Sequence, residues 1–233
     1  NKILKTLTIL IISTFIGNYT LAQEVNIYTS RHYDSDDALY SEFTDSTGIK
    51  VNIISGSGNA LLERLKAEGS DSPADIFFTV DAGNLWRIQK EGFFRSINSE
   101  EIKNIVPKNL RGPNDEWVAI AKRARVIYYN PEVISPERME EVSYEDLSNP
   151  DWNGKIAIRS SSNMYNQSLV ASLISNHGID KTEEWAKGLV NNFSRKPQGN
   201  DRAQIMAVAN GEATLGIANS YYIGIMLSGS AGI

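Results

Sequence analysis

Three stretches of the sequence place tyrosine after a β-rich run and a short polar turn, where a helix is expected to begin. In open α/β sheets, ligands bind beyond the carboxyl ends of the strands, and the N-termini of the following helices point to the same place. We therefore expect four phenols to converge on one cleft. The motifs are Val25–Tyr28 followed by Tyr33, Ile156–Ile158 followed by Tyr165, and Leu215–Ala218 followed by Tyr221 and Tyr222.

Several phenols in one cleft are typical of a site for a hard, highly charged cation. The phenol pKa is ordinarily about 10, so several phenols ionise together near neutral pH only against a strong positive charge. A trivalent cation supplies that charge, and its binding releases the phenol protons. Fe(III) suits oxygen donors of this kind, whereas zinc usually recruits more histidine or carboxylate. The acidic stretch Asp34–Asp37 lacks the spacing and the glycine of a calcium-binding loop.

Other interpretations of the same residues stay open at this point. A tyrosine pair such as Tyr221 and Tyr222 is by itself more often packing than chemistry, because tyrosine is an ordinary amphipathic packing residue. The cleft could bind an organic solute, such as a sugar, a polyamine or a phosphorylated compound, with the tyrosines as stacking walls. A hydrolase built on Ser160–Ser162 is disfavoured, because no nucleophile elbow surrounds these serines and the chain has two histidines.

Three segments, IYTSRHYDSDDALYSEFTDSTGIKV, RSSSNMYNQSLVASL and GIANSYYIG, together resemble the ferric iron-binding subunits of bacterial iron ABC importers, particularly the tyrosine-rich cyanobacterial and marine type. The resemblance extends over the whole chain after residue 22. It implies a transferrin-like periplasmic binding protein that is monomeric, is not an enzyme, and closes on Fe(III). It also implies delivery of the ion to a permease in the inner membrane, with a water or a synergistic anion in any open coordination position.

The resemblance also implies a set of metal ligands. Carried over by motif, the ligands are Tyr33, Tyr165, Tyr221 and Tyr222, and His32 stands where several relatives use a histidine ligand. Relatives with histidine and glutamate ligands would place the glutamate in the region where this chain has Asn59, while Glu63 lies within the expected helix. We therefore favour an all-tyrosine arrangement with His32 peripheral.

Arginines accompany the tyrosine motifs. Arg159 precedes the serine run and could neutralise phenolate charge or bind a synergistic anion, although a surface salt bridge is an alternative. Arg123 and Arg125 could act in the same way or serve a structural role. We expect Arg159 and Arg123 to stand next to the ligands without contacting the metal.

Composition and the first residues indicate an exported protein. Lys2 and Lys5 precede the apolar run Leu7–Ile16, the pattern of a secretory signal peptide that is too short to span a membrane. Without this leader the chain has 21 basic and 28 acidic residues and a formal net charge of −7, which does not suggest a nucleic-acid partner. The absence of cysteine excludes disulfides and thiolate chemistry, and a chain of this size fits the bacterial periplasm.

The order of the elements predicts two α/β lobes in one chain. The resemblance implies that they form a two-lobed periplasmic binding protein of type II, each lobe a mixed sheet flanked by helices. Hinge strands are expected near residues 117–129 and 214–219. The predicted divisions are a signal peptide over 1–22, an N-terminal lobe over 23–122, a second lobe over 123–220, and over 221–233 a helix start leading to a C-terminal segment absent from this chain.

The spacing of apolar residues, together with residues that typically start or end helices, predicts the individual elements. The four tryptophans are expected in the core or in packing between the lobes. Strands are predicted over 25–29, 49–54, 74–79, 117–121, 126–129, 155–158 and 214–218; helices are predicted from Tyr33 to a stop at Gly48, over 60–68, from Asp81, over 165–178, over 181–191 and over 201–210, with a turn or helix over 144–147.

Overall fold

The computed structural model describes residues 23–31 and 33–229. The predicted signal peptide and His32 therefore lie outside the described residues. The chain divides into two compact units, the first ending at Val80 and the second beginning at Asp81. This division falls earlier in the chain than the lobe boundary expected between residues 122 and 123, and that boundary stays a prediction.

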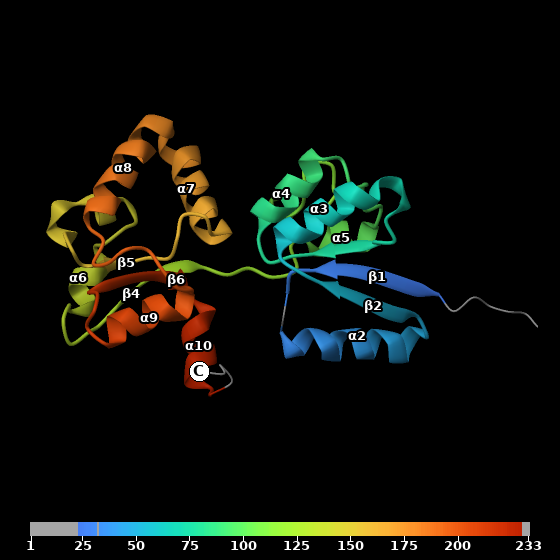
Figure 1. Ribbon diagram of the computed structural model, residues 1–233, viewed down its shortest axis with the longest axis horizontal. Helices are drawn as coiled ribbons and strands as arrows, with labels where there is room; N and C mark the ends of the chain where they lie inside the picture. Colours follow the sequence, from blue (N-terminus) through green and yellow to red (C-terminus); the bar gives the residue numbers. More distant parts are fainter. Residues whose placement is uncertain (1–22, 32, 230–233) are drawn as a thin grey trace, which may run out of the picture. The chain divides into compact units, whose positions relative to one another are not determined.

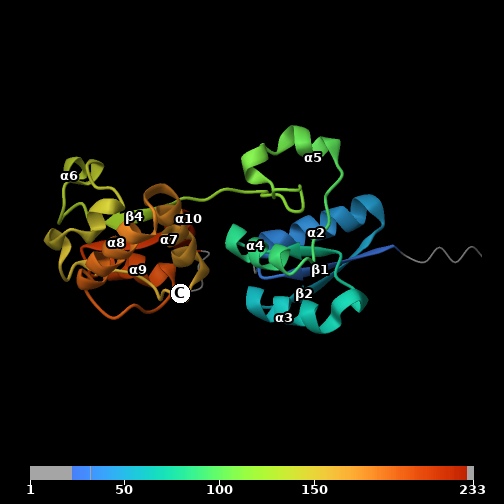
Figure 2. The same cartoon turned by 90° about the horizontal axis from the view of Figure 1, so that it is seen from above.

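The first unit is a parallel sheet with a helix on each face (Figures 1 and 2). Its central strand β1 (Glu24–Thr29) pairs with β2 (Lys50–Ser55) and β3 (Ile76–Phe78). The helices α2 (Asp34–Thr47) and α3 (Gly58–Glu68) cover opposite faces, and the short 3-10 turn η1 (Gly69–Asp71) follows α3. The alternation of strand and helix thus forms a parallel three-stranded arrangement in this unit.

Local signals explain where the elements of the first unit end and which faces they bury. Gly48 ends α2 in the left-handed conformation with φ 72°, which only glycine adopts without strain. On α3, Leu61, Leu62 and Leu65 recur at helical spacing and are buried. Tyr28 of β1 is fully buried as well. The apolar face of α3 and the central strand therefore form the core of this unit.

The second unit is organised around β6 (Leu215–Asn219), whose five residues are all buried. β6 pairs antiparallel with β4 (Arg125–Tyr129) and parallel with β5 (Ile156–Ala157), so the sheet is mixed. The other elements of this unit are α4 (Ala82–Lys90), α5 (Glu100–Ile105), η2 (Lys108–Leu110), α6 (Pro136–Glu140), η3 (Glu145–Ser148), η4 (Pro150–Trp152), α7 (Met164–His177), α8 (Ile179–Asn191), α9 (Asp201–Ala209) and α10 (Tyr221–Leu227).

Helices cover both faces of this second sheet, with α7 and α8 on one side and α9 on the other (Figure 1). Leu215 and Ile217 point to the first side, where they pack in a cluster that contains Trp152 and Trp185. Gly216 faces α9, and a Cβ on it would lie 2.9 Å from the backbone oxygen of Gln204. The glycine therefore allows α9 to pack closely on β6, which sets the distance between the helix start and the strand end.

One strand predicted from the sequence is absent. Residues 117–121 are not a strand: Val118 makes one isolated antiparallel bridge with Arg111, because a tight turn in which Asp115 has φ 54° reverses the chain and the pairing goes no further. Trp86 lies outside the core, since it is 53% exposed, with the ammonium group of Lys90 4.5 Å from its ring centroid, and its packing between the lobes stays a prediction. A tryptophan ring that contacts a cation on one face can remain partly exposed to solvent.

The remaining predicted elements are present with ends that differ by a few residues. Among residues 23–31 and 33–229, none of the helices has the length and the apolar character that crossing a membrane requires.

Candidate functional site

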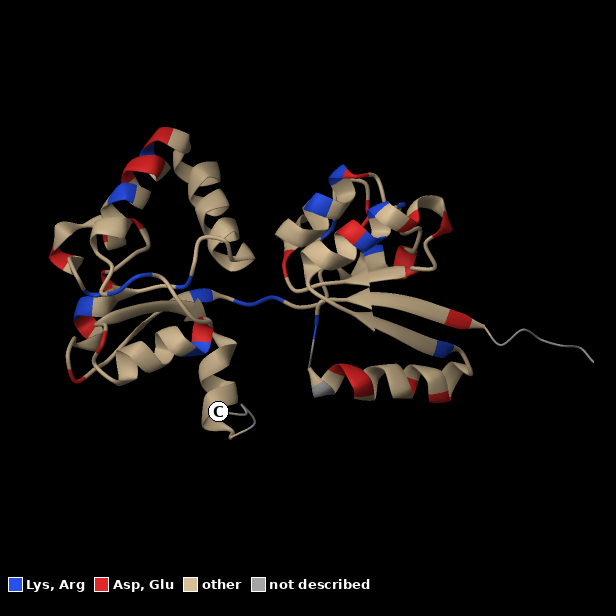
Figure 3. Cartoon of the chain, viewed as in Figure 1, with Lys and Arg blue, Asp and Glu red and all other residues tan. Residues whose placement is uncertain are grey.

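The topology of the second sheet brings two of the three tyrosine motifs to one edge. Because β5 and β6 are parallel neighbours, their carboxyl ends lie at the same edge, and β4, which is antiparallel, begins there. Tyr165 is the second residue of α7, which follows β5, and the pair at 221 and 222 begins α10, which follows β6. The basic segment over residues 122–125 leads into β4 at this edge (Figure 3).

The two helices start in different ways. Asn163 caps α7 as expected of an N-cap residue, its side-chain oxygen accepting a hydrogen bond of 3.0 Å from the backbone nitrogen of Tyr165. Ser220 precedes α10 but makes no side-chain capping bond, and the side-chain oxygen of Asn219 instead accepts from Arg125 at 3.0 Å. The start of α10 is therefore held by contacts from outside the helix rather than by a local cap.

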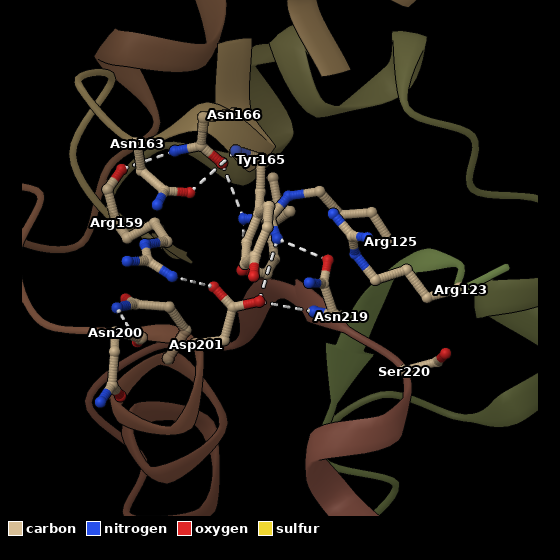
Figure 4. A network of polar contacts seen from close by, with 12 residues as sticks. Arg123, Arg125, Arg159, Asn163, Tyr165, Asn166, Asn200, Asp201, Asn219 and Ser220 are labelled. Carbon is tan, nitrogen blue, oxygen red and sulfur yellow. Dashed lines mark hydrogen bonds and ion pairs between the residues drawn. The ribbon is translucent and has the colours of Figure 1, made fainter. Parts of the chain in front are cut away.

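Three guanidinium groups surround the ring of Tyr165 (Figure 4). Their carbon atoms lie 4.5 Å, 5.9 Å and 5.6 Å from the ring centroid for Arg123, Arg125 and Arg159 respectively. Each distance is within the range of a cation–π contact. Three positive charges around one phenol are well placed to offset negative charge on its oxygen.

Carboxylates hold these arginines in place. Arg125 and Arg159 each donate to Asp201, at 3.1 Å and 2.9 Å, and Asp201 is 0% exposed. Arg123 donates to Asp81 at 2.7 Å. Arg159 therefore does form an ion pair, as the structural alternative predicts, but the pair is with a buried carboxylate beside Tyr165 rather than with a group on the surface.

Asn166 links the arginines to the tyrosine motif of α7. Its side-chain oxygen accepts from Arg125 at 2.7 Å, and its side-chain nitrogen donates to the backbone oxygen of Arg159 at 2.7 Å. Because Asn166 is the residue after Tyr165, the network fixes both the cations and the turn of helix from which the phenol extends (Figure 4).

The tyrosine pair of α10 is stacked and also accompanied by a cation. The ring centroids of Tyr221 and Tyr222 are 4.3 Å apart with an interplanar angle of 32°, and both side chains are half-buried. The guanidinium carbon of Arg202 lies 5.7 Å from the ring centroid of Tyr222. The second unit thus carries Tyr165 and this pair in positively charged surroundings.

The first unit carries the remaining tyrosine motif, which has the same chemical character. Tyr33 immediately precedes α2 and is half-buried, and the guanidinium carbon of Arg31 lies 4.9 Å from its ring centroid. Arg31 is fixed by Asp36 through contacts of 2.8 Å and 2.7 Å. A guanidinium group within 6 Å of a tyrosine ring is therefore common to all three motifs.

Burial favours the neutral form of two other tyrosines of the second unit. Tyr128 donates its hydroxyl hydrogen to the backbone oxygens of Asn219 and Ser220, both at 3.1 Å, and burial raises its pKa. Burial also raises the pKa of Tyr144 to about 12. Tyr128 therefore stabilises the backbone that leads from β6 into α10.

The remaining polar candidates have structural partners. His177 ends α7 and contacts Glu145 at 2.6 Å, and Ser160 and Ser162 contact each other at 2.9 Å. Within the part of the chain that the structure describes, no three His, Cys, Asp or Glu side chains are grouped so as to hold a metal ion.

Sequence reasoning missed Asp201, Asn166 and Arg31. An aspartate after an asparagine indicates a helix start, and nothing in that local pattern indicates partners far along the chain. Arg31 lies inside the first tyrosine motif, so its proximity to Tyr33 was available from the spacing alone.

A profile of the family of bacterial extracellular solute-binding proteins matches residues 71–228. Among individual proteins, iron uptake protein A1 of Synechocystis sp. is 53% identical over 205 residues, which are 88% of this chain and 56% of that protein. The Fe(3+)-binding periplasmic protein of Serratia marcescens is 30% identical over 200 residues, which are 86% of this chain and 58% of that protein. The chain thus spans little more than half the length of these relatives.

Solved structures match in fold as well as in sequence. A Trichodesmium protein (IdiA, FutA), solved in complex with iron and citrate, aligns with a TM-score of 0.80 and 56% identity over 85% of this chain and 62% of its own. The ferric binding protein of Campylobacter jejuni aligns with a TM-score of 0.81 and 40% identity over 86% of this chain and 63% of its own.

Proposed function

The chain belongs to the family of bacterial extracellular solute-binding proteins, and we propose that within this family it is a carrier of Fe(III). The proposed ligands are the phenolate oxygens of Tyr165, Tyr221 and Tyr222 in the second unit together with Tyr33 of the first. His32 lies outside the described residues, and we propose that it is peripheral to the metal. The proposed carrier works in the periplasm as a monomer, without catalysis, and delivers the ion to the permease of an iron ABC importer.

The observation that carries this proposal is the positive charge around the tyrosines. Three guanidinium groups lie within 6 Å of the ring of Tyr165, and another accompanies Tyr222. Four phenolates around one Fe(III) leave about one excess negative charge, which these cations would offset. Packing alone gives no reason to gather three arginines around one tyrosine.

The relatives support the choice of iron. The names of the Synechocystis and Serratia proteins refer to iron uptake and to Fe(3+) binding, and the Trichodesmium protein was solved with iron and citrate. The tyrosine–arginine motifs of this chain fit such a ligand because phenolate is a hard oxygen donor. A small anion or a water would complete the coordination, with Arg159 and Arg123 next to it.

The proposal is tested by measuring the visible absorption of the iron-loaded protein. The purified protein, loaded with Fe(III) supplied as a weak chelate, should show the visible charge-transfer band of ferric phenolate. Changing both Tyr221→Phe and Tyr222→Phe should abolish the band. Tyr129→Phe is the matched control, because Tyr129 lies on β4 and packs against the core of the same unit, and this variant should keep the band.

An uncoloured wild-type protein after ferric loading would refute iron binding by phenolate. If calorimetry then showed that the protein binds a sugar, polyamine or phosphorylated compound independently of iron, the organic-solute alternative would replace the proposal.

A further inference from the structure

Asp201 connects the two tyrosine motifs that lie at one edge of the second sheet. We propose that it is a positioning residue for the iron site, which sets the separation between Tyr165 and the pair at 221 and 222 without contacting the ion. This inference rests on the proposed function. Its physical basis is a single buried carboxylate that makes hydrogen bonds to three different parts of the chain (Figure 4).

The first connection leads to Tyr165. One carboxylate oxygen of Asp201 accepts from Arg159 at 2.9 Å and the other accepts from Arg125 at 3.1 Å. Both arginines face the ring of Tyr165, and both are bonded to Asn166, the next residue on α7. A displacement of Asp201 would therefore release the cations that contact the ring and the first turn of the helix that carries it.

The second connection leads to the tyrosine pair. The same oxygen that accepts from Arg125 accepts at 2.8 Å from the backbone nitrogen of Asn219, the last residue of β6. Tyr128 holds the backbone oxygen of the same residue from the other side. Since Tyr221 begins α10 two residues later and that helix has no side-chain cap, these contacts fix where the pair begins.

The position of Asp201 in its own helix leaves the carboxylate available for this role. Asn200 caps α9 by accepting from the backbone nitrogen of Ala203 at 3.1 Å, so the helix does not need Asp201 for that purpose. A carboxylate with no exposure to solvent requires charged or hydrogen-bonding partners, and here all of them come from other elements. In other metal centres, residues that do not bind the metal orient its ligands through hydrogen bonds. Asp201 is placed to act in the same way.

The test compares variants that alter the support with one that only weakens the unit. In Asp201→Asn the amide group would present N–H to one of the donors that the carboxylate accepts from, which breaks one connection while keeping the size of the side chain. Arg159→Lys keeps the positive charge but loses the planar guanidinium group with its several N–H donors. This variant should fold because Arg159 is partly exposed. Asn192→Ala is the matched control, since Asn192 is buried in the same unit and its side chain donates to the backbone oxygens of Leu147 and Asn149.

The readouts are the charge-transfer band and the rate at which a strong chelator removes iron. Asp201→Asn should shift the band and speed iron release by about 10- to 100-fold, the usual range for losing a supporting partner of a metal ligand. Arg159→Lys should change both in the same direction by a smaller factor. Asn192→Ala should lower the thermal midpoint and leave both readouts unchanged.

Two results would contradict the inference, and both differ from failure of the proposed function. If Asp201→Asn and Arg159→Lys keep the wild-type band and release rate, Asp201 only stabilises the fold. If Asn192→Ala changes them equally, the effect comes from general loosening of the unit. Absence of a band in the wild-type protein would instead refute iron binding itself. Should Asp201→Asn fail to fold, Arg159→Lys is compared with Arg123→Lys, because Arg123 contacts the same ring but pairs with Asp81. Equal changes in the two variants would contradict a specific role for Asp201.

Discussion

Two of the clusters of tyrosine, arginine and carboxylate, Tyr28 with Glu68 in the first unit and Tyr165 with Asp201 in the second, use the same groups in opposite ways. In the first unit, Tyr28 donates its hydroxyl hydrogen to both oxygens of Glu68, at 2.8 Å and 2.7 Å. In the second unit, the carboxylate of Asp201 accepts from arginines that surround Tyr165. The comparison shows that the partner of the carboxylate, rather than the composition of the cluster, decides what the tyrosine can do.

The first arrangement keeps the phenol protonated. Burial raises the pKa of Tyr28, and the hydrogen bond to Glu68 raises it further. The same hydrogen bond, with those from Arg64 and Ser72, holds the pKa of Glu68 down to about 2. A phenol that gives its hydrogen to a carboxylate is a structural tie between β1 and the end of α3 and is poorly suited to bind a metal.

The largest expected difference between the clusters is in stability. Asp201→Ala should destabilise the second unit by about 3–5 kcal/mol, because Arg125 and Arg159 would lose their buried counter-charge. Glu68→Ala should cost less, because Arg64 can turn to solvent and the main loss is the hydrogen bond from the buried Tyr28 hydroxyl. All four tryptophans follow Asp81, so tryptophan fluorescence in urea reports the second unit, and hydrogen exchange of peptides that contain β1 reports the first. Equal losses in the two variants would contradict the assignment of Asp201 as the buried support.

Replacing Tyr28 or Tyr165 with phenylalanine separates the contribution of each tyrosine to stability from its contribution to iron binding. Tyr28→Phe should destabilise the first unit by about 1.5–3 kcal/mol, the usual contribution of a hydrogen bond to a charged group, and leave the ferric band unchanged. Tyr165→Phe should have the reverse effect, with loss or strong weakening of the band at nearly wild-type stability. Ferric titration would measure the band and thermal melting the stability of each variant. If Tyr28→Phe also removed the ferric band, the contrast between the two tyrosines would be contradicted.

Local patterns in the sequence were sufficient to predict most elements and the tyrosine motifs. The run that ends at Ala218 is apolar and bounded by Gly211 and Asn219, so its strand was predicted within one residue. The tyrosines were identified because each stands at fixed spacing after such a run. These signals lie within a few residues of the feature that they predict, which is why sequence alone reveals them.

The supports of the site were not predictable because their partners are distant in the chain. Asp201 binds Arg125 and Arg159, which precede it by 76 and 42 residues. The register of β4 against β6, which places Arg125 opposite Asn219, brings Arg125 to Asp201, and the pairing of β5 with β6 brings Arg159 to the same edge. The strand predicted over 117–121 failed for a related reason, since strand pairing depends on a neighbour that the local pattern does not name.

The acid sensitivity of the first unit should depend on Glu68. Because its folded pKa of about 2 lies below the ordinary 4.5, its stabilising contribution is complete above about pH 4.5 and is lost as the pH falls toward 2. Glu68→Gln should remove this part of the acid dependence, whereas Glu63→Gln on the exposed side of the same helix should not. Hydrogen exchange of peptides that contain β1, corrected for the intrinsic effect of pH, would measure it; parallel acid profiles for wild type and Glu68→Gln would contradict the assignment.

The smallest effect is expected at Tyr144, a tyrosine with neither kind of partner. Among the described residues its buried hydroxyl has no hydrogen-bond partner, and burial raises its pKa to about 12. Removing an unsatisfied buried hydroxyl relieves its desolvation cost, so Tyr144→Phe should change the stability of the second unit by about 0.5 kcal/mol or less, or raise it slightly. Urea unfolding followed by tryptophan fluorescence would measure this, with the ferric band as a second readout that should not change. A loss as large as that expected for Tyr28→Phe would mean that the Tyr144 hydroxyl makes a stabilising hydrogen bond, and the contrast between tyrosines with and without a charged partner would then fail.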